Sequence, residues 1–302
     1  MTKTSLPVVF FGSGPVAAAS LRLLNNNFTI ESVVTKPRAA HHKGSVPVIE
    51  AAEELGLPVH TVVNKRTLDE LIASKPFTST LAILIDFGII VSQTAIDYFP
   101  LGIINSHFSL LPQWRGADPI TFSILSGQKE TGVSLMLLTA GMDEGPILAY
   151  GAYPLPPRIT TPELTHDLIE LSDVLLQEVV PAYASGSIIA KPQDNVADAT
   201  YSRKLTKEDG AIDWSKPADQ IEREIRAFIE WPKSSTTLAK HDVVITAAHV
   251  LEASGEPGNA VKLSKQLVVY CGKDALIIDS LKPAGKKEMT GQAFLAGYGN
   301  LL

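Results

Sequence analysis

Short apolar runs alternate with helical patterns along the first half of this 302-residue chain, and this alternation restricts the fold more than any other feature. The expected strands span residues 7–11, 29–35, 59–63, 80–85 and 101–104, and the expected helices span 17–24, 48–55, 68–74 and 95–99. Such alternation predicts an α/β fold with a parallel sheet covered by helices on both faces. Ligands of these sheets bind outside the carboxyl ends of the strands.

The pattern changes further along the chain. A strand at 132–139 with a return strand at 148–155 precedes a long amphipathic helix over 161–183, and a polar stretch at 187–199 indicates a weakly ordered linker. A helix at 218–228 is then followed by β-rich runs at 243–247, 260–263, 267–271 and 275–281. Short strands with turn residues between them favour a small barrel.

The charge is distributed unevenly. The net charge is −6, so the protein as a whole is not a basic nucleic-acid binder. Residues 1–200 carry 12 basic against 19 acidic side chains, net −7, whereas residues 201–302 carry 14 against 13, net +1. The second part is therefore better suited than the first to holding a polyanion, although a net charge of +1 is close to neutral.

Cysteine content and hydropathy indicate the compartment. The single cysteine, Cys271, excludes an internal disulfide framework and a cysteine-rich zinc site, and we expect it to be an inert strand residue. No apolar stretch approaches 18 residues, and the first residues lack the long apolar core of a signal peptide. We therefore expect a cytoplasmic protein without a membrane segment.

The turn Gly12-Ser13-Gly14-Pro15-Val16-Ala17 follows the first strand and matches a loose form of the dinucleotide-binding fingerprint. However, Pro15 removes an amide that could hold phosphate, and no acid stands at the end of the second strand. We favour a purely structural turn between strand and helix.

Asn105, His107 and Asp143 form a more informative set. A neutral amide can donate to an oxygen as negative charge develops on it, and an imidazole can move a proton near neutral pH. A nearby carboxylate would orient the imidazole. The set suits attack of an amine on a carbonyl. The alternative is that Asn105 and Asp143 cap turns and that His107 is an ordinary loop residue.

The run Asn105-x-His107-x-Ser109-Leu110-Leu111-Pro112-x-x-Arg115-Gly116, followed by Asp143-x-Gly145, resembles the signature of the folate-dependent formyltransferases. Residues 210–214, 225–228, 231–232 and 282–289 resemble the second domain of the methionyl-tRNA formyltransferase branch of this family. The resemblance covers nearly the whole chain.

This resemblance implies a Rossmann-like parallel-sheet formyltransferase domain over residues 1–186, a linker over 187–206 and a C-terminal tRNA-binding OB-like β-barrel domain over 207–302. It implies that the formyl group of 10-formyltetrahydrofolate is transferred to the α-amine of methionyl initiator tRNA, for translation initiation. It requires no metal and implies no protein partner, so a monomer is expected.

The resemblance also assigns site residues. Asn105 and His107 would face the formyl group, with Asp143 supporting the imidazolium. The turn Ser109, Leu110, Leu111 and Pro112 would line the folate pocket, and the loop Asp86, Phe87 and Gly88 would contribute backbone contacts.

For tRNA, the family carries a basic loop after the second strand, which here is shorter and less basic. Arg38 and Lys43 are its expected phosphate contacts, and Lys282, Lys286 and Lys287 form a second basic cluster. For both groups, an ordinary solvated surface is the alternative.

Four other functions remain open at this stage. Within enzymes, formyl transfer to an amino sugar nucleotide and hydrolysis of formyltetrahydrofolate would use the same three residues. A non-catalytic nucleic-acid binder would rest on the barrel alone, and a nicotinamide-dependent dehydrogenase on the glycine turn alone.

Overall fold

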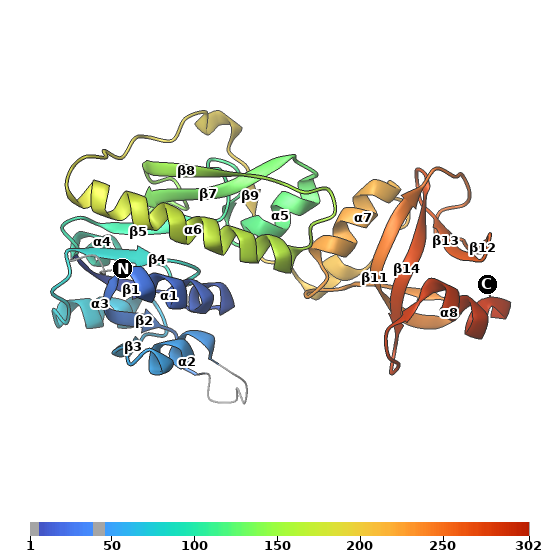
Figure 1. Cartoon of the computed structure of the whole chain (residues 1–302), viewed down its shortest axis with the longest axis horizontal. Helices are drawn as coiled ribbons and strands as arrows, with labels where there is room; N and C mark the ends of the chain where they lie inside the picture. Colours follow the sequence, from blue (N-terminus) through green and yellow to red (C-terminus); the bar gives the residue numbers. More distant parts are fainter. Residues whose placement is uncertain (1–5, 39–45, 302) are drawn as a thin grey trace. The chain divides into compact units, whose positions relative to one another are not determined.

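The computed structural model of the protein describes residues 6–38 and 46–301 and consists of two compact units (Figure 1). The first unit comprises the chain up to residue 119 together with 130–154 and 165–201, and the second comprises 120–129, 155–164 and the chain from 202 onward. The chain thus passes between the units several times. The sequence-based limits at residues 186 and 206 stay a prediction.

A seven-stranded sheet in the order β3-β2-β1-β4-β5-β7-β8 forms the first unit. Its strands are β1 (Pro7–Phe11), β2 (Thr29–Thr35), β3 (Val59–Thr61), β4 (Leu81–Leu84), β5 (Ile103–His107), β7 (Glu130–Leu137) and β8 (Ile147–Pro154). The strands β1 to β5 run parallel, whereas β7 is antiparallel to both β5 and β8. The parallel sheet therefore ends in an antiparallel pair, β7 and β8, as expected from the predicted strand at 132–139 and its return strand at 148–155.

Both faces of this sheet are covered. Val8, Val9, Phe10 and Phe11 of β1 alternate between the two faces and are all fully buried, as expected for a central parallel strand. The helices of the first unit are α1 (Pro15–Asn27), α2 (Pro47–Glu54), α3 (Lys65–Ala73), α4 (Gln93–Asp97) and, from residue 165 onward, α6 (Thr161–Ala184), whereas α5 (Pro119–Ser126) belongs almost entirely to the second unit. Helices α3 and α4 pack with β1, β2 and β4 in one apolar cluster.

Local sequence signals explain where two of these helices begin. Pro15 occupies the first turn of α1 directly after the tight glycine turn, where a missing N–H is tolerated. The side chain of Asn64 accepts from the Thr67 amide at 3.1 Å and Thr67 Oγ1 accepts from the Asn64 amide at 3.2 Å, which is a reciprocal cap for α3.

The second unit is an antiparallel sheet in the order β10-β11-β14-β13-β12, with β15 paired to β14. Its elements are α7 (Ala218–Ala227), β10 (Ser234–Leu238), β11 (His241–Leu251), β12 (Ala260–Leu263), β13 (Gln266–Tyr270), β14 (Ala275–Pro283), β15 (Met289–Thr290) and α8 (Gly291–Tyr298). The remaining short elements are β6 (Arg115–Gly116), which pairs β9 (Tyr201–Ser202), and the 3₁₀ turns Val196–Asp198, Lys207–Gly210 and Gly299–Leu301.

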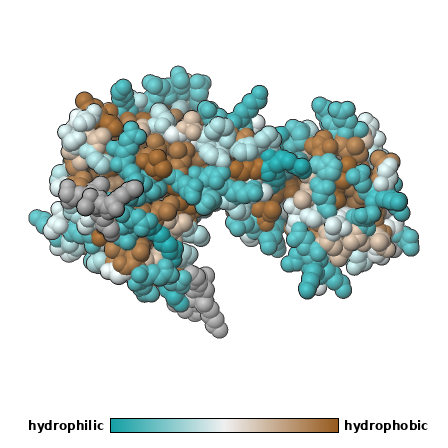
Figure 2. Space-filling view, in the orientation of Figure 1, coloured by the Kyte–Doolittle hydropathy of each residue, from teal (hydrophilic) through white to brown (hydrophobic). Residues whose placement is uncertain are grey.

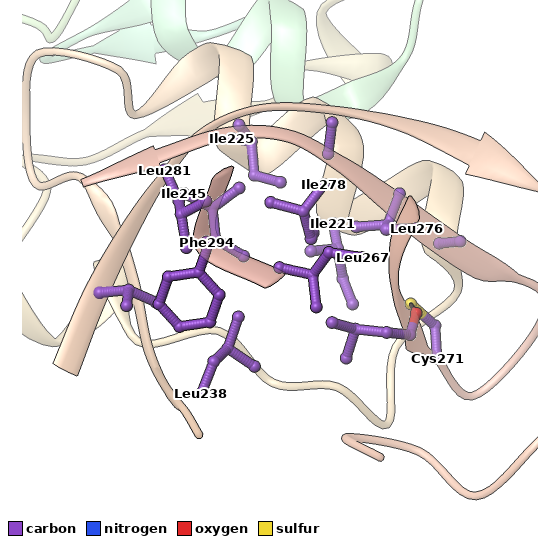
Figure 3. Close-up of a cluster of buried hydrophobic side chains, with 14 of the residues drawn as sticks. Ile221, Ile225, Leu238, Ile245, Leu267, Cys271, Leu276, Ile278, Leu281 and Phe294 are labelled. Atoms are coloured by element: carbon purple, nitrogen blue, oxygen red, sulfur yellow. Dashed lines mark hydrogen bonds between the residues drawn. The ribbon is translucent and has the colours of Figure 1, made fainter. Parts of the chain in front are cut away.

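Side chains from both helices and the sheet meet in the core of the second unit (Figure 3). Ile221 and Ile225 of α7, one helical turn apart, pack with strand residues such as Ile278, and Phe294 of α8 is fully buried beside them. The sequence did not predict α8, because Gly291, Gly297 and an almost uniformly apolar composition obscure any amphipathic period.

The predicted fold class is confirmed, with a parallel-dominated Rossmann-like sheet followed by a separate antiparallel β unit. Hydrophilic side chains cover much of the face of each unit drawn in Figure 2. Within the part of the chain that the structure describes, none of the helices has the length and apolar character needed to cross a bilayer.

The sequence predicted Cys271 within a strand, but it lies in the turn directly after β13. In this turn the Cys271 amide donates to the Asp274 carbonyl at 3.0 Å. It is 3% exposed, and Figure 3 shows it at one end of the apolar cluster. Burial raises the pKa of the Cys271 thiol to about 11. The folded state favours the protonated thiol. The stabilisation that the protonated Cys271 thiol gives to the folded state is therefore complete below the ordinary thiol pKa of about 8.5 and is lost as the pH rises toward 11.

We therefore predict that Cys271 does not react with a disulfide reagent such as DTNB at pH 8 in the native protein, and reacts fully in urea. Urea titrations that monitor unfolding of the second unit should be run at pH 7 and at pH 10. Between these pH values the free energy of unfolding should fall more in the wild type than in Cys271→Ala. Rapid native labelling at pH 8 would contradict the burial of this thiol.

Candidate active site

Strand β5 carries Asn105 and His107 within its last residues, not after its end. The sequence predicted that the strand stops at residue 104, but pairing with the antiparallel β7 extends it through His107, which lies opposite Ser134. Because side chains two residues apart share a face of a strand, Asn105 and His107 point the same way. Ser106 points to the opposite face, where its hydroxyl lies 2.7 Å from that of Ser172 in α6.

Asp143 joins these two residues from the loop between β7 and β8. Its Oδ1 accepts from Asn105 Nδ2 at 3.3 Å, and its Oδ2 accepts from the Gly116 amide at 2.8 Å and lies 3.7 Å from His107 Nδ1. The Asp143 backbone has a positive φ of 51°, a left-handed conformation that Asp tolerates better than most residues. The structure therefore brings together all three predicted catalytic side chains.

The partners of His107 determine where its protons lie. Nε2 lies 2.9 Å from the Trp114 carbonyl oxygen, which can only accept, so Nε2 must carry a proton. Nδ1 faces the Asp143 carboxylate, 3.7 Å from Oδ2. The imidazole is 6% exposed, so this carboxylate acts on it with little screening by water.

Two residues that were not assigned a role from the sequence hold the loop around Asp143. Arg115, 2% exposed, donates to Glu144 Oε1 at 3.3 Å and to Gln193 Oε1 at 2.8 Å. Gln193 in turn donates to the carbonyl oxygens of Asp143 and Gly145. Arg115 stands in the motif and could have been selected from it, whereas Gln193 lies in a polar stretch that gives no local signal.

A cavity of about 510 Å³ adjoins this loop. Its walls are formed by Arg115, Glu144, Pro146, Pro192, Gln193 and Val196. The cavity thus lies beside the arginine and glutamine that hold Asp143.

The turn predicted to line a folate pocket is held rigidly. Ser134 Oγ donates to the Ser109 carbonyl at 2.6 Å and accepts from the Leu111 amide at 2.9 Å, and Ser109 Oγ donates to the Gln113 carbonyl at 2.5 Å. Tyr150 donates to the Leu111 carbonyl, and partial desolvation together with the negative charge of Asp194 raises the pKa of this phenol, which keeps it a donor. Ser109 and Leu111 are buried, whereas Leu110 and Pro112 are partly exposed at the surface of the turn.

The loop at Asp86, Phe87 and Gly88 follows β4 at the same edge of the sheet. The carbonyl oxygens of Asp86 and Phe87 already accept from Ser13, and the Phe87 ring is buried edge-on against Phe11. The Asp86 carboxylate lies so close to Gly14 that a Cβ atom there would meet Oδ2 at 2.0 Å. A negative charge at the start of α1 leaves no favourable place for a pyrophosphate, which supports the structural interpretation of the glycine turn.

The predicted basic residues lie apart from these loops in sequence. Arg38 is exposed after β2, and Lys43 falls outside the described residues. Lys282, at the end of β14, and Lys286 and Lys287, in the following turn, are all exposed. No metal was predicted, and among residues 6–38 and 46–301 no group of three or more His, Cys, Asp and Glu side chains could hold one.

Comparison with known proteins agrees with this geometry. The model of the family described as "Formyl transferase" matches residues 8–180, and that of "Formyl transferase, C-terminal domain" matches residues 204–299. A methionyl-tRNA formyltransferase of Roseiflexus castenholzii is 37% identical over 294 residues, with 94% of each chain covered. The chain belongs to the methionyl-tRNA formyltransferase family. The corresponding protein of Chloroflexus aggregans is 39% identical over 302 residues, with 96% of each chain covered.

A solved structure shares the fold at much lower identity. The N-formyltransferase of Helicobacter canadensis, in complex with folinic acid and dTDP-3-aminofucose, has a TM-score of 0.67 and 18% identity, covering 90% of this chain and 99% of its own. The predictions of the family and of a formyl-transferring enzyme are confirmed by these relatives. The roles of the individual site residues stay predictions.

Gly145 offers a test of the loop that presents Asp143. A Cβ atom at Gly145 would lie 1.8 Å from the backbone oxygen of Leu137, which cannot move without breaking β7. We predict that Gly145→Ala lowers the formylation rate at least about tenfold, since misplacement of a reacting group by 1 Å can cost about 100-fold. Formylation assays and a thermal melt would measure this.

Gly297→Ala is the matched control, because a Cβ atom there would meet nothing within 4 Å. Gly297→Ala should keep the rate and should not lower the melting temperature, because Ala favours the helix α8 that holds it. Wild-type activity in Gly145→Ala would show that this loop need not hold its observed conformation.

Proposed function

We propose that the protein transfers the formyl group of 10-formyltetrahydrofolate to the α-amine of methionine esterified to initiator tRNA, for translation initiation. The observation that carries this proposal is the convergence of Asn105 and His107 on the Asp143 carboxylate. The relatives named methionyl-tRNA formyltransferase, which match over both units, support the same acceptor.

The proposed reaction begins with attack of the amine on the formyl carbon. One N–H of Asn105 Nδ2 points to Asp143, so the second remains to donate to the oxyanion that develops. Both nitrogens of His107 already face protein partners, so we assign it electrostatic stabilisation as an imidazolium rather than direct donation. Asp143 supports that charge and accepts the proton of the amine through water. This proton passes to N10 of the folate as the bond between N10 and the formyl carbon breaks, and tetrahydrofolate leaves.

Folate would bind along the two loops that follow β4 and β5. In this proposal Leu110 and Pro112 contact the pterin, and the buried Ser109 and Leu111 keep their turn in shape. Of Asp86, Phe87 and Gly88, the first two contribute through backbone already anchored by Ser13. A related fold that holds folinic acid supports this co-substrate class.

The tRNA would be held by exposed lysines of the second unit, Lys282, Lys286 and Lys287, together with Arg38 of the first. Lys43 belongs to the same proposal but lies outside the described residues. We also propose that the protein acts as a monomer in the cytoplasm, since neither substrate requires a second copy or a membrane.

The first experiment measures formylation with 10-formyltetrahydrofolate and methionine-charged initiator tRNA. Elongator methionyl-tRNA, an amino sugar nucleotide and a sample without acceptor run alongside. We predict formylation of the initiator alone, with a loss of about 100- to 1,000-fold in Asn105→Ala and in His107→Ala. The rate of His107→Asn should fall by a similar factor.

Consumption of folate by the sugar nucleotide or by water, with no transfer to tRNA, would replace this function by one of the two alternative enzyme activities. A wild-type rate in His107→Asn would remove the histidine from the chemistry.

The lysine cluster is tested separately. Alanine at Lys282, Lys286 and Lys287 should raise the KM for tRNA while kcat changes less than about twofold, and should reduce the slope of log affinity against log salt by about one per lost phosphate contact. Binding titrations at several salt concentrations measure this.

Alanine at the exposed Lys207, Lys262 and Lys265 removes the same charge elsewhere on the second unit and should leave the KM nearly unchanged. Equal effects of both triple variants would indicate a general electrostatic attraction between the second unit and tRNA instead of a defined contact surface.

A further inference from the structure

The polar stretch expected to be weakly ordered is tied to the active site at both ends. Lys191 forms two backbone hydrogen bonds with Ile147, the first residue of β8, at 2.6 and 2.8 Å. Nine residues further on, the Thr200 carbonyl accepts from the Arg115 amide at 2.9 Å, and Thr200 Oγ1 accepts from the Trp114 amide at 2.9 Å. The segment 191–200 therefore connects the start of β8, which follows the Asp143 loop, to the backbone at Trp114 and Arg115, which lies beside His107.

Gln193 is the buried residue of this bridge, at 7% exposure. Its Nε2 donates to the Asp143 carbonyl at 2.7 Å and to the Gly145 carbonyl at 3.0 Å, while its Oε1 accepts from Arg115 Nη2 at 2.8 Å. The amide thus uses both of its N–H donors and its oxygen. Glutamate could not donate to the two carbonyls, and asparagine is one methylene shorter.

These contacts act on Asp143 from two directions. One hydrogen bond fixes the Asp143 backbone itself, at a residue with a positive φ. The hydrogen bond that Gln193 Oε1 accepts comes from Arg115, whose neighbour Gly116 donates its amide to Asp143 Oδ2. A single side chain therefore connects the backbone of Asp143 to the strand β6 that holds its carboxylate.

We propose that Gln193 is a positioning residue for Asp143: it sets the orientation of the carboxylate toward Asn105 and His107 without touching either substrate. This inference rests on the proposed function only in that Asp143 takes part in formyl transfer. Because Gln193 acts through the carboxylate, its contribution should disappear when the carboxylate is removed.

The test is a double-mutant cycle measured by kcat on the full-length protein. Gln193→Met keeps the length of the side chain and removes all three hydrogen bonds. We expect kcat to fall about 10- to 100-fold, as for other small misplacements of a reacting group, with the KM values for folate and tRNA within twofold. In an Asp143→Asn background, the same substitution should change kcat less than twofold.

Gln193→Glu provides a second, isosteric variant that retains acceptance from Arg115 but cannot donate to the two carbonyls, and it should show the same pattern. Gln177→Met, on the exposed face of α6, is the matched control and should keep wild-type kcat in both backgrounds. Circular dichroism and thermal melts verify folding, and if Gln193→Met does not fold, the cycle is completed with Gln193→Glu.

An equal loss of kcat with and without the Asp143 carboxylate would overturn the proposal, because it would show a general structural role. A wild-type kcat in both Gln193 variants would overturn it as well. Failure of the wild-type protein to formylate any acceptor would contradict the proposed function instead, so the two failures are distinguishable.

Discussion

The arrangement of the site depends on one carboxylate, that of Asp143. It accepts from the Asn105 amide and the Gly116 backbone amide and faces His107 Nδ1, so the strands β5 and β6 both meet its two oxygens. Even partial burial of a carboxylate is costly unless its oxygens are paired, and here each oxygen has a partner. The same pairing keeps an acceptor beside a histidine that already donates through Nε2.

The topology of the sheet makes this meeting possible. Five parallel strands end at one edge, where ligands of α/β sheets bind, and the antiparallel β7 then returns past β5. Because Leu137, the last residue of β7, pairs with Ile104, the loop that follows β7 and carries Asp143 starts beside the strand that carries Asn105. The bridge 191–200 constrains the loops from the other side.

Sequence patterns predicted most of the first sheet, the second β-rich unit and the site residues Asn105, His107 and Asp143, because each of these has a local signal. Buried strands such as β1 are continuous apolar runs, and the motif around Asn105 is dense. The end of β5 was misplaced because its last residues are polar and are strand only through tertiary pairing. Gln193 was missed because its partners lie about 50 and 78 residues away, beyond any local pattern.

The most direct test of this account is the single-turnover formylation rate of Asp143→Asn, measured together with its equilibrium affinity for a folate analogue and its melting temperature. Asparagine keeps the shape of the side chain but removes its charge. The account predicts a rate at least about 100-fold lower, with folate affinity within about twofold and little change in melting temperature. A rate within about threefold of wild type would contradict the central role given to this carboxylate.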